Sequence, residues 1–312
     1  MTKQLSFREH LINRAFYGGS PVVSDQTHWQ WNAKTKQFNH TRAQISGALI
    51  DNFDEVLVNA VDHYYKTVGK RNQLTEIHTS LDKNGVITVR NNGPGIPITK
   101  SWDGKKPTDK DVYLPGAVVS RERIGSNFND EAEPDRITGG MNGLGAKITN
   151  VGSVWFEIET CTGKQTYYQK FENRMLTEHT PVLKNQTGAS YTQIRWLPDY
   201  DQLCKLDKQT PNTDWIKTNW QAVHDMIQTR VWQVAVFTGT IKYHTHNQKR
   251  IMHKRMPGVY FNNQLYKTQI SEFIASFGFT NYKTLSLEGQ QIKYPWYLGL
   301  ALKSDLGLDA QP

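Results

Sequence analysis

The stretch that decides the fold reads Gly139-Gly140-Met141-Asn142-Gly143-Leu144-Gly145-Ala146-Lys147. Four glycines within seven positions leave successive backbone N–H groups uncovered, and such a run of N–H groups forms an anion-binding concavity. The residues that follow, 146–150, can open a helix, and the N-terminus of a helix favours negative charge. Lys147 adds a point charge suited to a terminal phosphate. The stretch therefore predicts a loop that binds phosphate.

Two common phosphate-binding patterns do not describe this loop. A Walker A loop requires Gly-x-x-x-x-Gly-Lys followed by Ser or Thr, which is absent. The dinucleotide fingerprint, a strand followed by Gly-x-Gly-x-x-Gly and a downstream acid, is not matched either. A different kind of nucleotide site is therefore indicated.

A helix is predicted over residues 49–65. Apolar residues recur there at helical spacing: Leu49, Phe53, Val56, Leu57, Ala60, Val61 and Tyr64. Glu55 and Asn59 lie four positions apart, so they share one face of this helix. A carboxylate can polarise a water for attack on phosphorus, and an amide oxygen can bind magnesium, which prefers oxygen ligands. Taken alone, this pair is more typical of solvated helix positions.

A strand pair follows the helix, predicted at residues 76–81 and 86–90 with a turn at residues 82–85. The second strand runs directly into Asn91-Asn92-Gly93-Pro94-Gly95-Ile96-Pro97. The glycines allow the backbone to approach a flat ligand. Asn91 can offer a donor and an acceptor to a base edge, and Ile96 can line an apolar slot. Taken alone, the motif is equally an ordinary Gly/Pro turn.

Residues 99–136 are polar and irregular in sequence, and a stretch of this length predicts a lid or a binding loop. Within it, Gly125-Ser126-Asn127 offers short polar side chains for ribose or phosphate oxygens, although these residues are also common in turns. Further strands are predicted at residues 154–160, 165–171, 190–196, 259–261, 264–266 and 294–302. Helices are predicted at residues 215–237 and 270–277.

Composition narrows the class of protein. The chain has 312 residues with 37% hydrophobic and 21% charged residues, which is a globular composition. No apolar run is long enough to cross a bilayer, and the N-terminus carries no secretion signal. Two cysteines without metal-ligand spacing fit a reducing compartment. A net charge of +8 suits a polyanionic partner, but it is also compatible with an ordinary basic protein.

Taken together and in this order, the motifs resemble the GHKL ATPases, and among these they are most similar to type II DNA topoisomerases. Residues 53–60 resemble the helix of that family that bears the general base and the magnesium ligand. Residues 91–97 resemble its adenine-binding turn, and residues 139–147 resemble its phosphate lid. The resemblance is strong over residues 45–155 and fainter elsewhere. A chaperone- or repair-type ATPase of the same group is disfavoured by the lid sequence.

The resemblance implies a role for each matching residue. Glu55 is the expected general base, Asn59 the magnesium ligand and Asn91 the adenine contact. The remaining expected contacts to ATP are Ile96, Ser126, Asn127, Asn142, Gly143, Leu144, Gly145, Ala146 and Lys147, the last also catalytic. The expected fold is α+β, a Bergerat two-layer sandwich of a mixed, largely antiparallel sheet with helices on one face. Gly125 departs from eukaryotic relatives, which have serine there, so one ribose contact is in doubt.

The resemblance also implies an organisation and a setting. Residues 1–290 are the expected ATPase domain, with a nucleotide core at 45–155 and a lid at 99–147, and residues 291–312 begin a truncated transducer domain. The family's lysine that reaches the terminal phosphate would lie beyond Pro312, and the arm that precedes the domain is nearly absent. We therefore expect ATP binding with weak hydrolysis.

Two functions follow as hypotheses. The first is the Mg-ATP-driven dimerisation of a type II topoisomerase, which closes the entry gate for DNA strand passage. Its expected partners are double-stranded DNA, contacted through phosphates, a second copy of the chain and the remaining topoisomerase domains or subunit, with no membrane. The alternative is a nucleotide-dependent interaction module with little or no turnover. The lid and Asn91 lean towards a viral or phage enzyme, placed in the host cytoplasm, whereas a eukaryotic enzyme would be nuclear.

Overall fold

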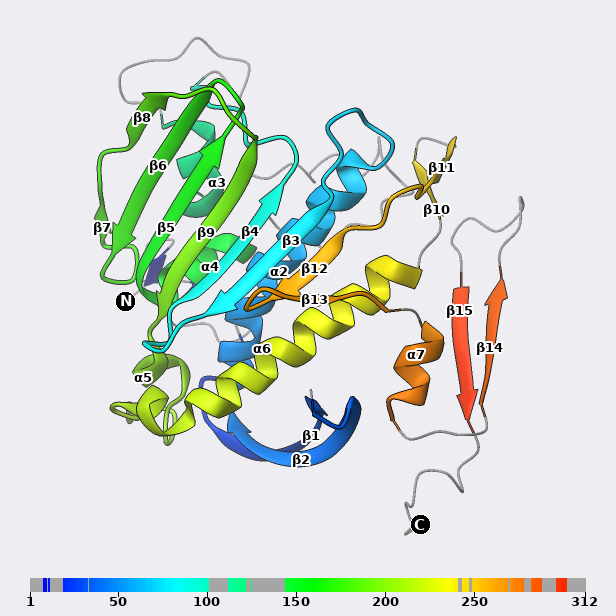
Figure 1. The fold of residues 1–312 in the computed structure, drawn as a ribbon. Coiled ribbons are helices and arrows are strands. Elements are labelled where there is room, and N and C mark those ends of the chain that lie inside the picture. Colours follow the sequence, from blue (N-terminus) through cyan, green and yellow to red (C-terminus); the bar gives the residue numbers. More distant parts are fainter. Residues whose placement is uncertain are drawn as a thin grey trace, which may run out of the picture.

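The computed structural model describes residues 8–9, 11, 19–32, 34–100, 112–121, 124, 144–240, 243–246, 249–268, 270–277, 282–287 and 296–301. Its main sheet is built from β3 Glu76–Leu81, β4 Ile87–Asn92, β5 Ser153–Cys161, β6 Gln165–Glu172, β7 Thr177–Glu178, β8 Val182–Asn185, β9 Tyr191–Pro198, β12 Gly258–Phe261 and β13 Gln264–Tyr266. The strand order is β13-β12-β3-β4-β9-β5-β6-β7, with β8 paired to β6 (Figure 1). Only β12 and β3 pair in parallel among these described strands. The predicted mixed, largely antiparallel sheet is confirmed.

Helix α2, Gly47–Thr67, crosses one face of this sheet. It begins after Ser46, whose Oγ accepts a hydrogen bond from the backbone N–H of Leu49 at 3.1 Å and so caps the first turn. Phe53 and Leu57 lie on its apolar face and are fully buried in the core. The predicted helix 49–65 is confirmed and is two residues longer at each end.

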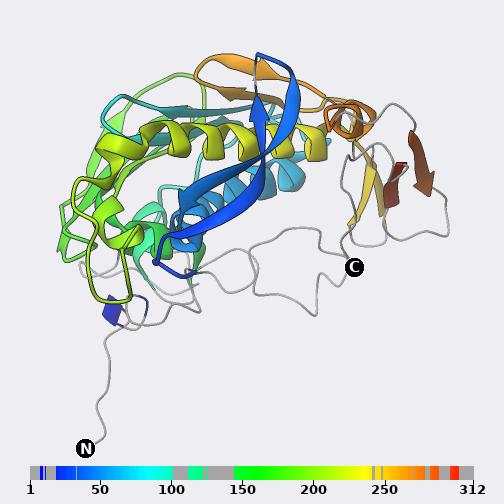
Figure 2. The same cartoon turned by 90° about the horizontal axis from the view of Figure 1, so that it is seen from below.

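A second long helix, α6, Trp215–Thr240, lies beside α2 on the same face of the sheet (Figures 1 and 2). Val223, Ile227 and Val231 recur at spacings of four and are completely buried. They pack into the same core as the apolar face of α2. The predicted helix 215–237 is confirmed, and it continues three residues further.

The stretch 99–136 is not irregular throughout, which corrects the prediction. Residues 114–120 form a short helix, α3, Leu114–Ser120. Pro115 suits a first helical turn because its missing N–H needs no partner there, and Ala117 and Val119 are buried. Their burial, rather than a periodic pattern, makes this segment helical. Residues 101–111, 122–123 and 125–143 lie outside the described residues.

The sequence did not predict the hairpin of β1, Ser24–Asn32, and β2, Gln37–Ile45, which curls around α6 (Figure 2). Trp31 stacks on Trp232 of α6 with ring centroids 4.8 Å apart. The backbone N–H of Trp31 also donates to Thr229 Oγ1 at 3.0 Å. Both strands are rich in polar residues, so their periodicity was too weak to identify them.

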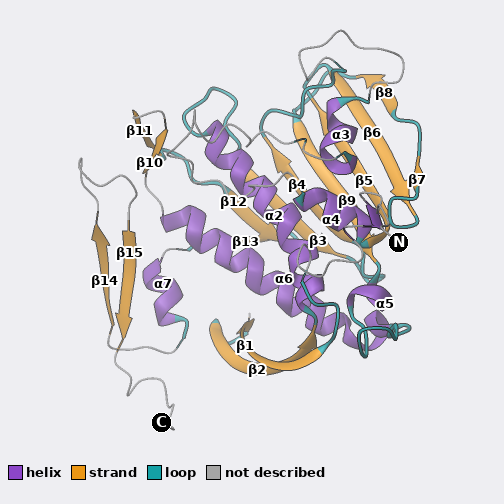
Figure 3. Ribbon diagram, turned by 180° about the vertical axis from the view of Figure 1, so that it is seen from behind, coloured by secondary structure: helices purple, strands orange, loops and turns teal. Residues whose placement is uncertain are grey.

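The remaining elements are smaller. After the glycine run, α4, Gly145–Val151, forms where a helix start was predicted. The other small elements are α5 Tyr200–Leu203, β10 Tyr243–His246, β11 Lys249–Met252 and α7 Ile270–Ala275. The predicted strand at residues 294–302 is β15, Trp296–Ala301, which pairs with β14, Tyr282–Leu287, beside α7 and apart from the main sheet (Figure 3). Within the described residues, no helix is both long and apolar enough to span a membrane.

Candidate nucleotide-binding site

The general base predicted on α2 lies against the start of α4. A Cβ placed on Gly145 would come within 2.0 Å of Glu55 Oε2 and 3.0 Å of its Cδ. Only a glycine lets the backbone of the glycine-rich stretch approach the carboxylate this closely. The structure therefore brings together Glu55 and the end of the predicted lid, which are 90 positions apart in the sequence.

A buried asparagine fixes α4 against α2. Asn52, 1% exposed, accepts a hydrogen bond from Trp196 Nε1 at 3.0 Å. Its backbone carbonyl accepts from Thr149 Oγ1 at 2.9 Å. On the other side of α4, Asn150 Nδ2 donates to the carbonyl of Val119 in α3 at 3.0 Å. Because these hydrogen bonds are buried, breaking one would leave an unpaired polar group, which is costly. They therefore hold α4 against α2 and α3.

Glu55 sits in an acidic part of α2. Burial raises the pKa of its carboxyl above the usual value, and the neighbouring carboxylates of Asp51, Asp54 and Asp62 raise it further. Arg230 of α6 forms a bidentate ion pair with Asp54, with Nε 2.9 Å from Oδ1 and Nη2 bound to Oδ2. A raised pKa suits a group that must accept a proton near neutral pH.

The predicted magnesium ligand is exposed one turn beyond Glu55. Asn59 Nδ2 donates to the backbone carbonyl of Glu55 at 2.6 Å. The amide nitrogen is therefore used within the helix, and the polar atom that remains is Oδ1, an oxygen of the kind that magnesium prefers. No cluster of three or more His, Cys, Asp or Glu suited to a metal occurs within the described residues. Magnesium at a nucleotide site does not need one, because phosphates and water supply most of its ligands.

Asn91, the predicted base contact, lies near the end of β4 and is 5% exposed. Its Nδ2 lies 3.1 Å from His63 Nδ1 and donates to the carbonyl of Asn92 at 2.8 Å. Asn92 has a different role, because its Oδ1 accepts from the backbone N–H groups of Thr75 and Glu76. Asn92 therefore connects the end of β4 to the start of β3. The amide oxygen of Asn91 remains available to another partner.

The turn after β4 is anchored on the neighbouring strands. The backbone N–H of Ile96 donates to Thr160 Oγ1 at 2.9 Å, and Thr160 Oγ1 lies 3.2 Å from Thr192 Oγ1. Thr192 in turn is the register partner of Asn91. A Cβ on Gly95 would lie 2.2 Å from the carbonyl oxygen of Cys161, so this close approach requires glycine. Thr160 and His63 were not predicted from the sequence, although His63 lies one further turn along the face of α2 that carries Glu55 and Asn59.

Lys147 is 2% exposed, and its Nζ donates to the carbonyl of Ile124 at 2.7 Å. Burial lowers the pKa of its ammonium to about 8. Leu144 is the N-cap residue of α4, and Ala146 packs against the core. The other predicted lid residues, Ser126, Asn127, Asn142 and Gly143, lie outside the described residues.

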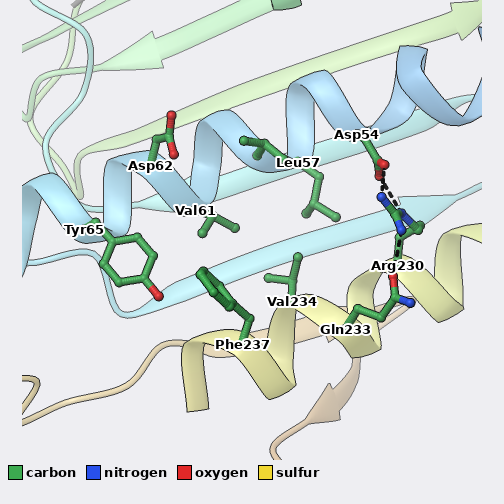
Figure 4. A pocket seen from close by; sticks show the side chains of 10 residues that line it. Asp54, Leu57, Val61, Asp62, Tyr65, Arg230, Gln233, Val234 and Phe237 are labelled. Atoms are coloured by element: carbon green, nitrogen blue, oxygen red, sulfur yellow. Dashed lines mark hydrogen bonds and ion pairs between the residues drawn. The ribbon is translucent and has the colours of Figure 1, made fainter. Parts of the chain in front are cut away.

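A groove of about 290 Å³ runs between α2 and α6 (Figure 4). It is lined by Asp54, Leu57, Val58, Val61, Asp62, Tyr65, Arg230, Gln233, Val234 and Phe237. The ion pair of Asp54 and Arg230 lies at one end, and Arg230 also donates to Gln233 Oε1 at 2.9 Å. None of the predicted nucleotide-binding residues lines it. The groove is thus separate from the site formed by Glu55 and Gly145.

The chain is similar in sequence to known DNA topoisomerases. No family model matches the chain. DNA topoisomerase 2 of Candida albicans is 31% identical over 233 residues, which are 73% of this chain and 15% of that protein. DNA topoisomerase 2 of African swine fever virus is 36% identical over 156 residues, which are 50% of this chain and 13% of that protein.

Solved structures of topoisomerase II ATPase regions also resemble the chain. The ATPase region of Saccharomyces cerevisiae topoisomerase II superposes with a TM-score of 0.69 at 26% identity, covering 88% of this chain and 64% of that chain. The ATPase and transducer domains of Balamuthia mandrillaris DNA topoisomerase II share the fold, with a TM-score of 0.73 at 21% identity.

The fold and the relatives of the chain define a nucleotide-binding domain of the GHKL type, as the sequence predicted. The particular relationship is narrower: the chain is a homologue of the ATPase region of type II DNA topoisomerases. It spans 15% or less of the length of these two curated relatives.

Proposed function

We propose that this chain binds and hydrolyses Mg-ATP, and that ATP-driven dimerisation closes an entry gate for the passage of a DNA duplex. The observation that best supports hydrolysis is the contact between Glu55 and Gly145. It puts a carboxylate at the junction between the helix of the predicted base and the predicted phosphate loop.

In the proposed reaction, Glu55 accepts a proton from a water. The water oxygen bonds to the γ-phosphorus while the bond from that phosphorus to the bridging oxygen breaks, which gives ADP and phosphate. Burial and acidic neighbours raise the pKa of Glu55, which makes it a better proton acceptor than a solvated carboxylate. Asn59 would hold magnesium, which neutralises charge on the phosphate oxygens. The protein otherwise acts by positioning.

Nucleotide recognition is divided between two parts of the site. Asn91 and Ile96 are proposed to contact adenine, because the buried amide and the turn anchored on Thr160 form one edge beside α2. The residues proposed to contact ribose and phosphates are Ser126, Asn127, Asn142, Gly143, Leu144, Gly145, Ala146 and Lys147. Lys147 would act as a donor to a terminal phosphate in place of the Ile124 carbonyl.

The test is ATP turnover by the chain and by Glu55→Gln, with ATP affinity measured in parallel. Loss of a general base costs on the order of 100- to 10,000-fold in rate, so turnover should fall that far while affinity changes little. Glu157→Gln is a matched control, because Glu157 lies on β5 and pairs with Arg195 at 3.4 Å. Turnover of Glu55→Gln equal to that of the parent would refute the assignment. ATP binding by the parent without turnover would favour the interaction module instead.

The partners need separate measurements. Dimerisation should follow the addition of a non-hydrolysable ATP analogue, which light scattering after size exclusion would detect. The net charge of +8 supports contact with DNA phosphates, and stimulation of turnover by DNA should then fall steeply with salt. A monomer at saturating nucleotide, or stimulation that does not depend on salt, would contradict these proposals.

We further propose residues 1–290 as the ATPase domain and 291–312 as the start of a transducer domain. Strand β15 lies in the second part, whereas its partner β14 lies in the first. If a chain ending at residue 290 unfolds as cooperatively as the whole chain, the division holds. Loss of cooperativity would place the boundary before β14. The compartment, host cytoplasm or nucleus, follows the source.

A further inference from the structure

Next to the proposed adenine contact lies a histidine that the reaction does not use. His63 is on α2, eight positions after Glu55, and its Nδ1 is 3.1 Å from Asn91 Nδ2. The same Nδ2 donates to the carbonyl oxygen of Asn92 at 2.8 Å. An amide nitrogen carries two hydrogens. Each of them therefore has an acceptor within the protein.

These contacts determine the orientation of the side-chain amide of Asn91. A side-chain amide can present either its oxygen or its NH2 group to a ligand. In the flipped orientation, Asn91 Oδ1 would face the Asn92 carbonyl oxygen and the lone pair of His63 Nδ1, so two hydrogen bonds would become two repulsive contacts. The backbone carbonyl is always an acceptor. His63 Nδ1 is an acceptor only while the ring is neutral and carries its proton on Nε2.

The surroundings keep that ring neutral. Burial, together with the nearby ammonium groups of Lys66 and Lys70, lowers the pKa of His63 to about 4. At neutral pH the ring is therefore uncharged, and the tautomer protonated on Nε2 offers a lone pair at Nδ1 that matches the Asn91 Nδ2 donor 3.1 Å away. The free polar group of the pair is then Asn91 Oδ1, which can only accept a hydrogen bond.

We propose that His63 is a positioning residue which holds the amide of Asn91 with its oxygen towards the base, and so selects a purine with a 6-amino group over one with a 6-oxo group. The inference rests on the proposed function, in which Asn91 contacts the base. A 6-amino group donates to Asn91 Oδ1. A 6-oxo group would place one acceptor against another, and such mismatches of buried polar groups discriminate strongly.

The experiment compares the affinities of the full chain for ATP and ITP, which differ in the groups at positions 1 and 6 of the purine. The parent should bind ATP more tightly. His63→Phe keeps a planar ring but removes the acceptor, so the ratio of the ITP to the ATP dissociation constant should fall about fivefold, the value of one hydrogen bond. His63→Asn restores an oxygen acceptor near the place of Nδ1 and should recover the ratio to within about twofold.

His78→Phe is the matched control. His78 lies on β3, pairs with Glu76 at 3.2 Å and stacks on Tyr260, and its substitution should leave the ratio unchanged. A ratio in His63→Phe equal to that of the parent would overturn the inference. So would an equal weakening of both nucleotides, which is what a purely structural role predicts. If the parent binds ATP and ITP equally, the selection is refuted while ATP binding stands, and binding of neither refutes the proposed function as well.

Discussion

Gly145→Ala should abolish most ATP hydrolysis and leave the fold intact. The added Cβ would lie 2.0 Å from Glu55 Oε2 and 3.0 Å from Glu55 Cδ. Both atoms belong to the outer end of a flexible side chain, so the carboxylate can rotate away without movement of the backbone. Alanine is also a better helix former than glycine at the start of α4. The melting temperature should therefore stay the same or rise slightly.

The size of the effect follows from the geometry. To regain an ordinary van der Waals distance of 3.4 Å, Glu55 Oε2 must retreat by about 1.4 Å. A displacement of about 1 Å at a reacting group costs on the order of 100-fold in rate. We therefore expect kcat to fall about 100-fold. The dissociation constant of ATP should change much less, because in the proposed reaction Glu55 acts on the water and not on the nucleotide.

Single-turnover hydrolysis of ATP, with binding of a non-hydrolysable analogue measured separately, would test this. Gly188→Ala is the control, since nothing lies within 4 Å of a Cβ at that position. If the substitution acts only through Glu55, combining it with Glu55→Gln should give a rate no lower than Glu55→Gln alone. A kcat within about threefold of the parent, or effects that multiply in the double variant, would refute the reasoning.

Three further predictions concern the stability and reactivity of the fold. Arg230→Gln should lower the free energy of unfolding by about 1–2 kcal/mol, less than for a fully buried pair because the Arg230 side chain is 39% exposed, and urea denaturation would detect it. An equal loss in Lys217→Gln, which removes the largely exposed ion pair with Asp214, would contradict a special role of the ion pair between Arg230 and Asp54. The pKa of His63 is about 4 in the folded chain against a usual 6.5, so the unfolded chain binds more protons between these values and stability falls as the pH drops from 6.5 towards 4. Between pH 7 and pH 5 the parent should lose about 2 kcal/mol more than His63→Phe, and equal losses would show that His63 is not buried in its neutral form. Burial raises the pKa of the Cys204 thiol to about 12, so Ellman's reagent should modify it at pH 8 only after unfolding, and rapid reaction of the native chain would contradict its placement.

Periodic segments were predictable from the sequence because their burial is encoded locally. The apolar stripe that includes Phe53 and Leu57 predicted α2 to within two residues at each end. The order of motifs and the family resemblance also led us to predict that Glu55 and Asn91 belong to one nucleotide site, and this stays a prediction. The hairpin β1–β2 was missed because few of its side chains are apolar, and α3 was missed because it is too short for a period to appear.

Contacts between distant residues could not be read from the sequence. His63 meets Asn91 across 28 positions, and Arg230 meets Asp54 across 176. Neither pair shares an element, and no local pattern specifies which residues oppose each other across a helix–strand or helix–helix contact. The side of α2 on which His63 lies could nevertheless have been predicted from the helical spacing. It continues the face of Glu55 and Asn59 at the next spacing of four, so it had to lie on the same side of α2.

That shared face has a consequence for how the two ends of a nucleotide are handled. Glu55 and His63 are eight residues apart on one continuous helix, so they are separated by about 12 Å along its axis. The carboxylate end is fixed by α4 through Asn52 and Thr149, and the histidine end is fixed by the amide of Asn91. Because α2 is one continuous helix whose apolar face packs in the core, the distance between Glu55 and His63 cannot change without breaking one of these contacts. In the proposed site, the helix would thus set the separation at which a base and a terminal phosphate can both be bound.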